Sequence, residues 1–125
     1  MLTPGLPTVL IVEDDVPTRE LYRAVLIQSG YAVTGVDDGL AALRVIEASP
    51  PDIIILDMAL PRLGGRDVLR ELRANPATRT LPIIIVTGTD VTNLNERALT
   101  PVLQKPVDPD ALVEAVGDTL RRAVR

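Results

Sequence analysis

The stretch Ile53-Ile-Ile-Leu56-Asp57 is a run of large aliphatic residues that ends directly in a carboxylate. Two other apolar runs also end at a polar residue, Thr8-Val-Leu-Ile-Val12 before Glu13 and Pro82-Ile-Ile-Ile-Val86 before Thr87. Continuous apolar runs of this length are typical of strands that are buried on both faces, as in parallel sheets. The three runs therefore predict three inner strands of a parallel sheet, each followed by a polar side chain.

Helical patterns lie between these strands. Pro17 suits the first turn of a helix, and apolar residues from Leu21 to Leu26 follow it before Gly30. Strand and helix alternate five times, which predicts a parallel sheet with helices on both faces. The remaining predicted elements are a weak edge strand at 31–36, a helix carrying Leu40 to Ile46, a helix carrying Val68 to Leu72, a short helix at 91–99, a short strand at 102–104 and a last helix from about Pro109.

The amino-acid composition limits the chemistry that is open to this chain. With 125 residues and 46% apolar side chains it is long enough for one domain with a real core. We expect residues 1–125 to form that single domain, with a flexible lead-in at 1–7. Cysteine and histidine are both absent, which excludes disulfides, thiolate and imidazole metal ligands and the commonest general base. Any chemistry must depend on carboxylates, hydroxyls, lysine or arginine.

The charge and hydropathy patterns indicate a cytoplasmic protein. The net charge of −4 argues against direct nucleic-acid binding by this domain, because domains that bind nucleic acid usually carry a basic face. No apolar run approaches the roughly 20 residues that span a bilayer. Residues 1–7 lack the charged start and apolar stretch of a signal peptide. We therefore expect a soluble protein without membrane contact.

Polar side chains follow the predicted strands at their carboxyl ends, namely Glu13 and Asp14, Asp57, Thr87 and Lys105. In parallel sheets these ends meet at one edge, where ligands bind. Carboxylates that meet there repel one another, and a hard cation such as Mg²⁺, Mn²⁺ or Ca²⁺ relieves that repulsion. Because a carboxylate can also be a covalent acceptor, the pattern favours phosphoryl chemistry.

Lys105 is the single lysine of a chain with twelve arginines, and it directly precedes Pro106. A lysine ammonium binds phosphate as a compact point charge, whereas arginine favours a planar bidentate contact. Taken singly, these polar residues have structural explanations: Asp15 as a helix N-cap, Asp57 as the point where a strand reaches water, and Lys105 as a surface charge. Their common location at the strand ends favours a shared site.

In this order the motifs resemble the receiver domain of two-component response regulators, over about residues 9–120. They are the acidic pair Glu13-Asp14, the segment Leu56-Asp57-Met-Ala-Leu-Pro61, Thr87-Gly88 and Lys105-Pro106. The resemblance implies an α/β fold of the flavodoxin-like, doubly wound type. In this family a five-stranded parallel sheet of strand order 2-1-3-4-5 is covered by five helices.

The resemblance implies a role for each residue that contacts the phosphoryl group. Asp57 would be the phosphoacceptor. Thr87 would hydrogen-bond one phosphoryl oxygen, and Lys105 would pair with another. The Lys105-Pro106 peptide bond is commonly cis in this family, which would aim the lysine inward.

The resemblance also implies the ligands of a Mg²⁺ or Mn²⁺ ion. Asp14 would be the main side-chain ligand, and Glu13 would act chiefly through a water molecule. Asp57 would contact the same ion, and Ala59 would contribute its backbone carbonyl.

The partners implied by the resemblance are proteins. The phosphoryl donor would be a phosphohistidine on a sensor histidine kinase or a phosphotransfer protein. Phosphorylation would change the surface around residues 87–105 and the last helix, where a downstream protein target would bind. Homodimer formation through the last helices is left open. The chain would be a signalling module that promotes its own phosphotransfer and dephosphorylation, and not an enzyme.

Three residues depart from the family pattern. Val102 and Val107 stand where aromatic residues are usual, so we expect a weaker or different conformational output; Ala59 offers no hydrogen-bonding side chain.

The alternative function is a degenerate, phosphorylation-independent receiver that acts as an interaction module. A phosphatase of the haloacid dehalogenase type is disfavoured because it needs an acidic residue at the position of Ala59. A flavin carrier is disfavoured by the acidic loops and the 2% aromatic content.

Overall fold

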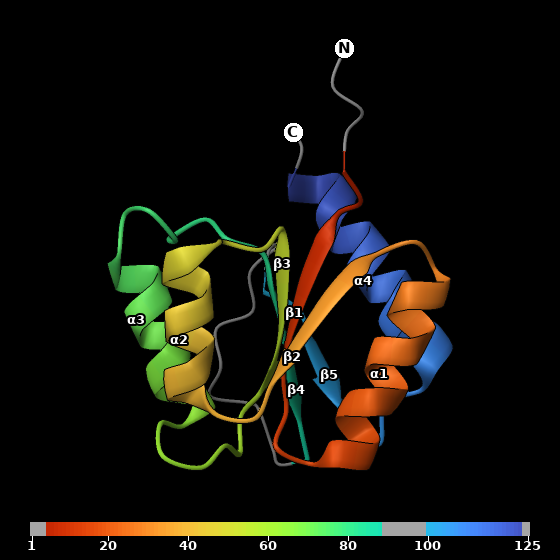
Figure 1. Cartoon of the computed structure of the whole chain (residues 1–125), viewed down its shortest axis with the longest axis horizontal. Coiled ribbons are helices and arrows are strands. Elements are labelled where there is room, and N and C mark those ends of the chain that lie inside the picture. Colours follow the sequence, from red (N-terminus) through yellow and green to blue (C-terminus); the bar gives the residue numbers. More distant parts are fainter. Residues whose placement is uncertain (1–4, 89–99, 124–125) are drawn as a thin grey trace.

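The computed structural model describes residues 5–88 and 100–123, in which strands and helices alternate along the chain. Figure 1 shows three layers, with a parallel sheet between two pairs of helices. The strands are β1 (Thr8–Val12), β2 (Ala32–Val36), β3 (Ile53–Asp57), β4 (Ile83–Thr87) and β5 (Val102–Gln104). The helices are α1 (Val16–Gln28), α2 (Gly39–Ala48), α3 (Gly65–Ala74) and α4 (Pro109–Ala123).

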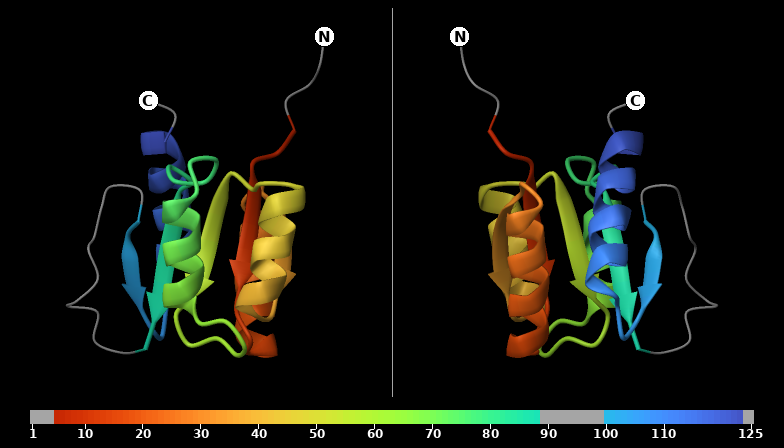
Figure 2. Two further views of the ribbon diagram at one scale, coloured as in Figure 1. Left: turned by 90° about the vertical axis from the view of Figure 1, so that its left-hand side faces the viewer. Right: turned by 90° about the vertical axis from the view of Figure 1, so that its right-hand side faces the viewer.

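The sheet has the order β2-β1-β3-β4-β5, and every neighbouring pair is parallel. This confirms the predicted flavodoxin-like, doubly wound topology. Helices α1 and α4 cover one face, and α2 and α3 cover the other (Figures 1 and 2). The fifth helix was predicted at 91–99, which lies outside the described residues, as do residues 1–4 of the predicted lead-in.

Successive side chains of a strand point to opposite faces of the sheet. Because helices cover both faces, both sets of side chains of the three inner strands are buried. In β3, Ile53 and Ile55 pack into the core beneath α1 and α4. Ile54 and Leu56 pack into the second core, beneath α2 and α3. The edge strands β2 and β5 are partly exposed, in agreement with their weaker apolar patterns. A continuous apolar run was therefore a correct indication of a central strand.

Two apolar residues of the predicted helical patterns are exposed rather than buried. Tyr22 and Leu26 are the buried residues of α1, while the neighbouring Leu21 is 48% exposed. In α2 the residue Ile46 faces the core and Leu40 is 40% exposed. Successive helical residues are about 100° apart around the axis, so an apolar neighbour of a core residue can point to solvent. No helix in the described part of the chain is long and apolar enough to span a membrane.

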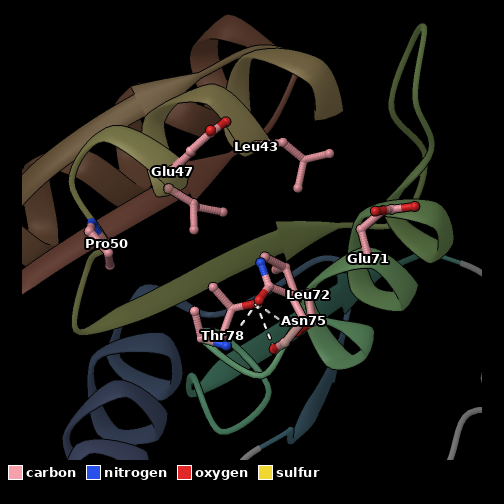
Figure 3. A pocket seen from close by; sticks show the side chains of 9 residues that line it. Leu43, Glu47, Pro50, Glu71, Leu72, Asn75 and Thr78 are labelled. Atoms are coloured by element: carbon pink, nitrogen blue, oxygen red, sulfur yellow. Dashed lines mark hydrogen bonds between the residues drawn. The ribbon is translucent and has the colours of Figure 1, made fainter.

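A groove of about 430 Å³ opens between α2 and α3 (Figure 3). Its lining includes the apolar residues Leu43 and Leu72, with Glu47 and Glu71 from the same two helices. The hydroxyl of Thr78 donates to the carbonyl of Leu72 at 2.7 Å, which ties the chain after α3 back to that helix. The groove shares no residue with the acidic strand ends.

Candidate functional site

The carboxyl ends of the strands bring the predicted polar residues to one edge of the sheet, the lower edge in Figure 1. Val12 of β1 is level with Leu56 of β3, so the residues that follow them, Glu13 and Asp57, lie at the same height. Strand β1 leads into a helix on one face of the sheet, and β3 leads into a helix on the other. This is the switch point at which doubly wound folds bind ligands.

Three carboxylates form the acidic group of this site. Glu13, Asp14 and Asp57 each place a carboxylate oxygen so that all three oxygens lie within 4.8 Å of one another. Glu13 and Asp57 are only 1% and 4% exposed, whereas Asp14 is open to solvent. Oxygen donors without imidazole or thiolate suit a hard cation such as Mg²⁺ or Mn²⁺. The residues present therefore fit the divalent cation that the sequence motifs implied.

The backbone of Ala59 contacts the acidic group. Its N–H donates to Oδ1 of Asp57 at 3.2 Å. The carbonyl predicted to contact the cation belongs to this same residue, at the start of the loop that joins β3 to α3.

Lys105 supplies the positive charge of the site. Its Nζ lies 2.8 Å from Oε1 of Glu13 and 3.4 Å from Oδ2 of Asp57. Partial burial of the ammonium opposes its charge, but the hydrogen bond to Glu13 and the charge of Asp57 outweigh that effect and raise the pKa of Lys105. The lysine is therefore protonated at neutral pH. The Lys105-Pro106 bond is cis, as expected from the resemblance.

Thr87 is the buried last residue of β4, 3% exposed. Its carbonyl accepts the backbone N–H of Lys105 at 2.8 Å, so the two residues predicted to contact a phosphoryl group are joined through their backbones.

Asp15, by contrast, is the N-cap of α1. Hydrogen bonds from the hydroxyl and N–H of Thr18 lower the pKa of Asp15. The capping interpretation of Asp15 is therefore confirmed.

Sequence reasoning missed the contacts that hold Glu13 in place. Its side chain accepts a hydrogen bond from the N–H of Asp15 at 3.2 Å as well as the one from Lys105. Its backbone carbonyl accepts a hydrogen bond from Nη1 of Arg19 at 2.8 Å. The predicted role of Glu13 was chiefly a water-mediated contact with the cation, whereas in the structure it is also the closest partner of Lys105. Arg19 gave no sequence signal, because arginine on a helix is usually solvated.

Substitution of Lys105 by methionine is expected to lower the free energy of unfolding by about 2 kcal/mol in EDTA. It leaves the Glu13 carboxylate, 1% exposed, without its cation. The expected loss is smaller than for a fully buried pair, because the Lys105 side chain is 30% exposed. Excess Mg²⁺ is expected to reduce this loss, because the folded variant, which lacks the lysine charge, should bind the cation more tightly than the parent does. Urea unfolding followed by circular dichroism measures both effects.

Arg23→Met, which removes an exposed cation from α1, is the matched control and should change stability little under either condition. An unchanged unfolding free energy for Lys105→Met in EDTA, or a loss that Mg²⁺ does not reduce, would contradict this account of the site.

The comparisons with known proteins point to one family. Residues 9–117 match the family model described as the response regulator receiver domain. The DNA-binding response regulator MtrA of Mycobacterium tuberculosis is 34% identical over 118 residues, covering 91% of this chain and 50% of MtrA. The chain spans about half the length of the curated relatives it matches.

Solved structures agree with this match. A putative response regulator from Chloroflexus aurantiacus superimposes with a TM-score of 0.85 at 32% identity, covering 95% of this chain and all of that one. The Mn²⁺-bound form of response regulator Rcp1 superimposes with a TM-score of 0.72 at 27% identity. The matched region covers 89% of this chain and 90% of the Rcp1 chain. The likeness extends over nearly the whole chain.

Proposed function

This chain belongs to the response regulator receiver domain family, and from that premise we propose that it works as a single receiver domain whose Asp57 accepts a phosphoryl group. The donor is the phosphohistidine of a sensor histidine kinase or of a phosphotransfer protein. One observation carries the proposal: the buried Asp57 carboxylate has the Lys105 ammonium 3.4 Å away and the Glu13 and Asp14 carboxylates beside it.

In the proposed transfer, a carboxylate oxygen of Asp57 forms a bond to phosphorus while the bond from phosphorus to the donor imidazole breaks. The imidazole leaves with the electron pair of the broken bond. Lys105 neutralises charge on the incoming group, and Thr87 donates a hydrogen bond to a phosphoryl oxygen. A Mg²⁺ or Mn²⁺ ion held by Asp14, Asp57 and the Ala59 carbonyl, with Glu13 through water, would neutralise further charge on the phosphoryl oxygens.

The signalling output follows from charge added at one edge of the sheet. A phosphoryl group on Asp57 brings acceptor oxygens beside Thr87 and Lys105. We expect this to change the partner surface around residues 87–105, of which 89–99 lie outside the described residues, and around α4. A downstream protein, or a second copy of the chain, binds this changed surface. Val102 and Val107 are only half-buried and smaller than the usual aromatic residues, so we propose a weaker conformational response.

Contact with nucleic acid is not part of the proposed role of this domain. Its net charge is −4, and such contact usually requires a basic face. The name of MtrA describes a protein of which this chain matches 50%. The proposed partners of the residues described here are therefore proteins.

Intact-protein mass spectrometry after incubation with acetyl phosphate tests the function. The expected result is one phosphoryl adduct with Mg²⁺ and none in EDTA, because the cation offsets the repulsion between the acidic group and the donor. Beryllofluoride, which mimics a bound phosphoryl group, should bind under the same conditions. Absence of both adduct and beryllofluoride binding, while a control receiver is labelled, would favour the phosphorylation-independent interaction module.

A further inference from the structure

The loop between β3 and α3 carries Ala59 and is fastened to the first turn of α2. Arg62 of the loop forms an ion pair with Asp38, the N-cap residue of α2. The Asp38 side chain is 2% exposed and the Arg62 side chain is 66% exposed, so the loop covers the carboxylate from outside. Oδ1 of Asp38 also accepts the N–H of Ala41 at 2.8 Å, which leaves Oδ2 to the guanidinium. One buried carboxylate thus both caps a helix and holds the loop.

A close backbone contact accompanies this ion pair. An ideal Cβ on Gly39 would lie 2.2 Å from the carbonyl oxygen of Leu63, so α2 and the loop approach more closely there than a side chain permits. Gly39 directly follows Asp38, and Leu63 directly follows Arg62. The ion pair and the backbone contact therefore act at the same point.

The backbone at Arg62 is in an unfavourable conformation. Its φ of 64° lies in the left-handed region, and among the described residues it is the non-glycine residue with a positive φ. Such a conformation persists where surrounding contacts determine it. Within the described part of the chain, the ion pair with Asp38 is the side-chain contact that holds Arg62.

The ends of the loop are fixed independently of Arg62. Next to β3, the Met58 N–H donates to the carbonyl of Val86 at 3.2 Å. At the start of α3, the Gly65 N–H donates to the carbonyl of Met58 at 3.3 Å. The middle of the loop, residues 59–63, contacts other elements through packing of Leu60 and Leu63 against the core beneath α2 and α3. Among the described residues of this segment, the Arg62–Asp38 ion pair is the charged link to another element.

We propose that Arg62 and Asp38 are positioning residues that hold the β3–α3 loop in the conformation that binds the divalent cation beside Asp57. This inference rests on the proposed function, because the cation contact of Ala59 belongs to it. A loop that is already ordered loses less conformational entropy when the cation binds. Removal of the ion pair should weaken cation binding without unfolding the domain.

The chain offers a variant that separates positioning from stability. Arg62→Gly removes the guanidinium, and glycine accepts a φ of 64° without strain. Relief of the backbone strain offsets part of the cost of leaving the Asp38 carboxylate without its cation, so we expect a melting temperature only a few degrees below that of the parent protein. Asp38→Asn keeps an oxygen for the N–H of Ala41 while removing the charge that Arg62 needs. Arg62→Lys keeps the positive charge and is the conservative rescue.

The experiment measures the Kd for Mg²⁺ by isothermal titration calorimetry and amide hydrogen exchange of residues 59–63 in the metal-free protein. For Arg62→Gly and Asp38→Asn we expect a Kd about tenfold higher, with faster exchange in this segment. The double variant should bind no more weakly than either single variant, because both changes break one contact. Arg62→Lys should bind nearly as the parent does.

The outcomes distinguish this inference from the proposed function. Parental Kd values and unchanged exchange in both single variants would overturn it, and so would additive losses in the double variant. If the parent protein itself binds no Mg²⁺, the proposed function fails and hydrogen exchange alone decides whether the ion pair orders the loop. Faster exchange in both variants would then support the ordering role, and unchanged exchange would refute it.

Discussion

Replacement of Asp57 by asparagine is expected to slow phosphoryl uptake from acetyl phosphate at least about a thousandfold, to below detection by intact mass. The amide matches the carboxylate in shape but lacks the negative charge that makes the oxygen nucleophilic. It also removes one of the three carboxylates of the acidic group, so Mg²⁺ binding should weaken in parallel. The fold should survive, because the substitution relieves repulsion among the crowded carboxylates.

The control for this prediction is Asp37→Asn, which changes an exposed carboxylate and should leave labelling unchanged. Circular dichroism of both variants confirms that loss of labelling does not reflect unfolding. A phosphoryl adduct that persists in Asp57→Asn at the parental rate would place the acceptor elsewhere, and peptide mapping would locate it.

The second large effect is expected from Gly65→Ala, with a loss of about 3 kcal/mol in the free energy of unfolding. An ideal Cβ at Gly65 would lie 2.5 Å from the carbonyl oxygen of Asp57 and 2.6 Å from Cα of Met58. Both are backbone atoms of the β3 end, so no side-chain rotation relieves the contact. The melting temperature should fall by about 10 °C for a domain of this size. Because the displaced backbone carries Asp57, the proposed phosphoacceptor, labelling should slow as well.

Gly64→Ala is the matched control in the same loop. Its Cβ would meet no atom nearer than Oδ2 of Asp67 at 3.9 Å, and its φ of −69° suits alanine. We expect its stability to stay within about 0.5 kcal/mol of the parent. Thermal melts of the two variants, recorded side by side, check the pair. Equal melting temperatures would contradict the prediction and would mean that the backbone at Asp57 and Met58 shifts to accommodate the added Cβ at little cost.

Most of the fold could be predicted because its signal is local. Each inner strand is an uninterrupted aliphatic run, and the helices between them carry apolar residues at helical spacing. The candidate site was predictable for a related reason: parallel strands place their carboxyl ends at one edge, which brings Glu13, Asp57 and Thr87 together. The exposure of Leu21 and Leu40 could not be predicted, because residue type alone does not give a helix its rotation against the sheet.

The amino-acid pattern alone was enough for the parallel α/β class, the strand-end location of the site and the capping role of Asp15, since each depends on residues that are neighbours in the chain. The strand order 2-1-3-4-5 was predicted from the family resemblance. The tertiary structure alone decided that Lys105 pairs with Glu13, 92 positions away, and that Arg62 pairs with Asp38. Which side chains form such ion pairs depends on how loops from different elements pack against one another. No periodic pattern encodes that packing, because each contact is made once and between distant segments.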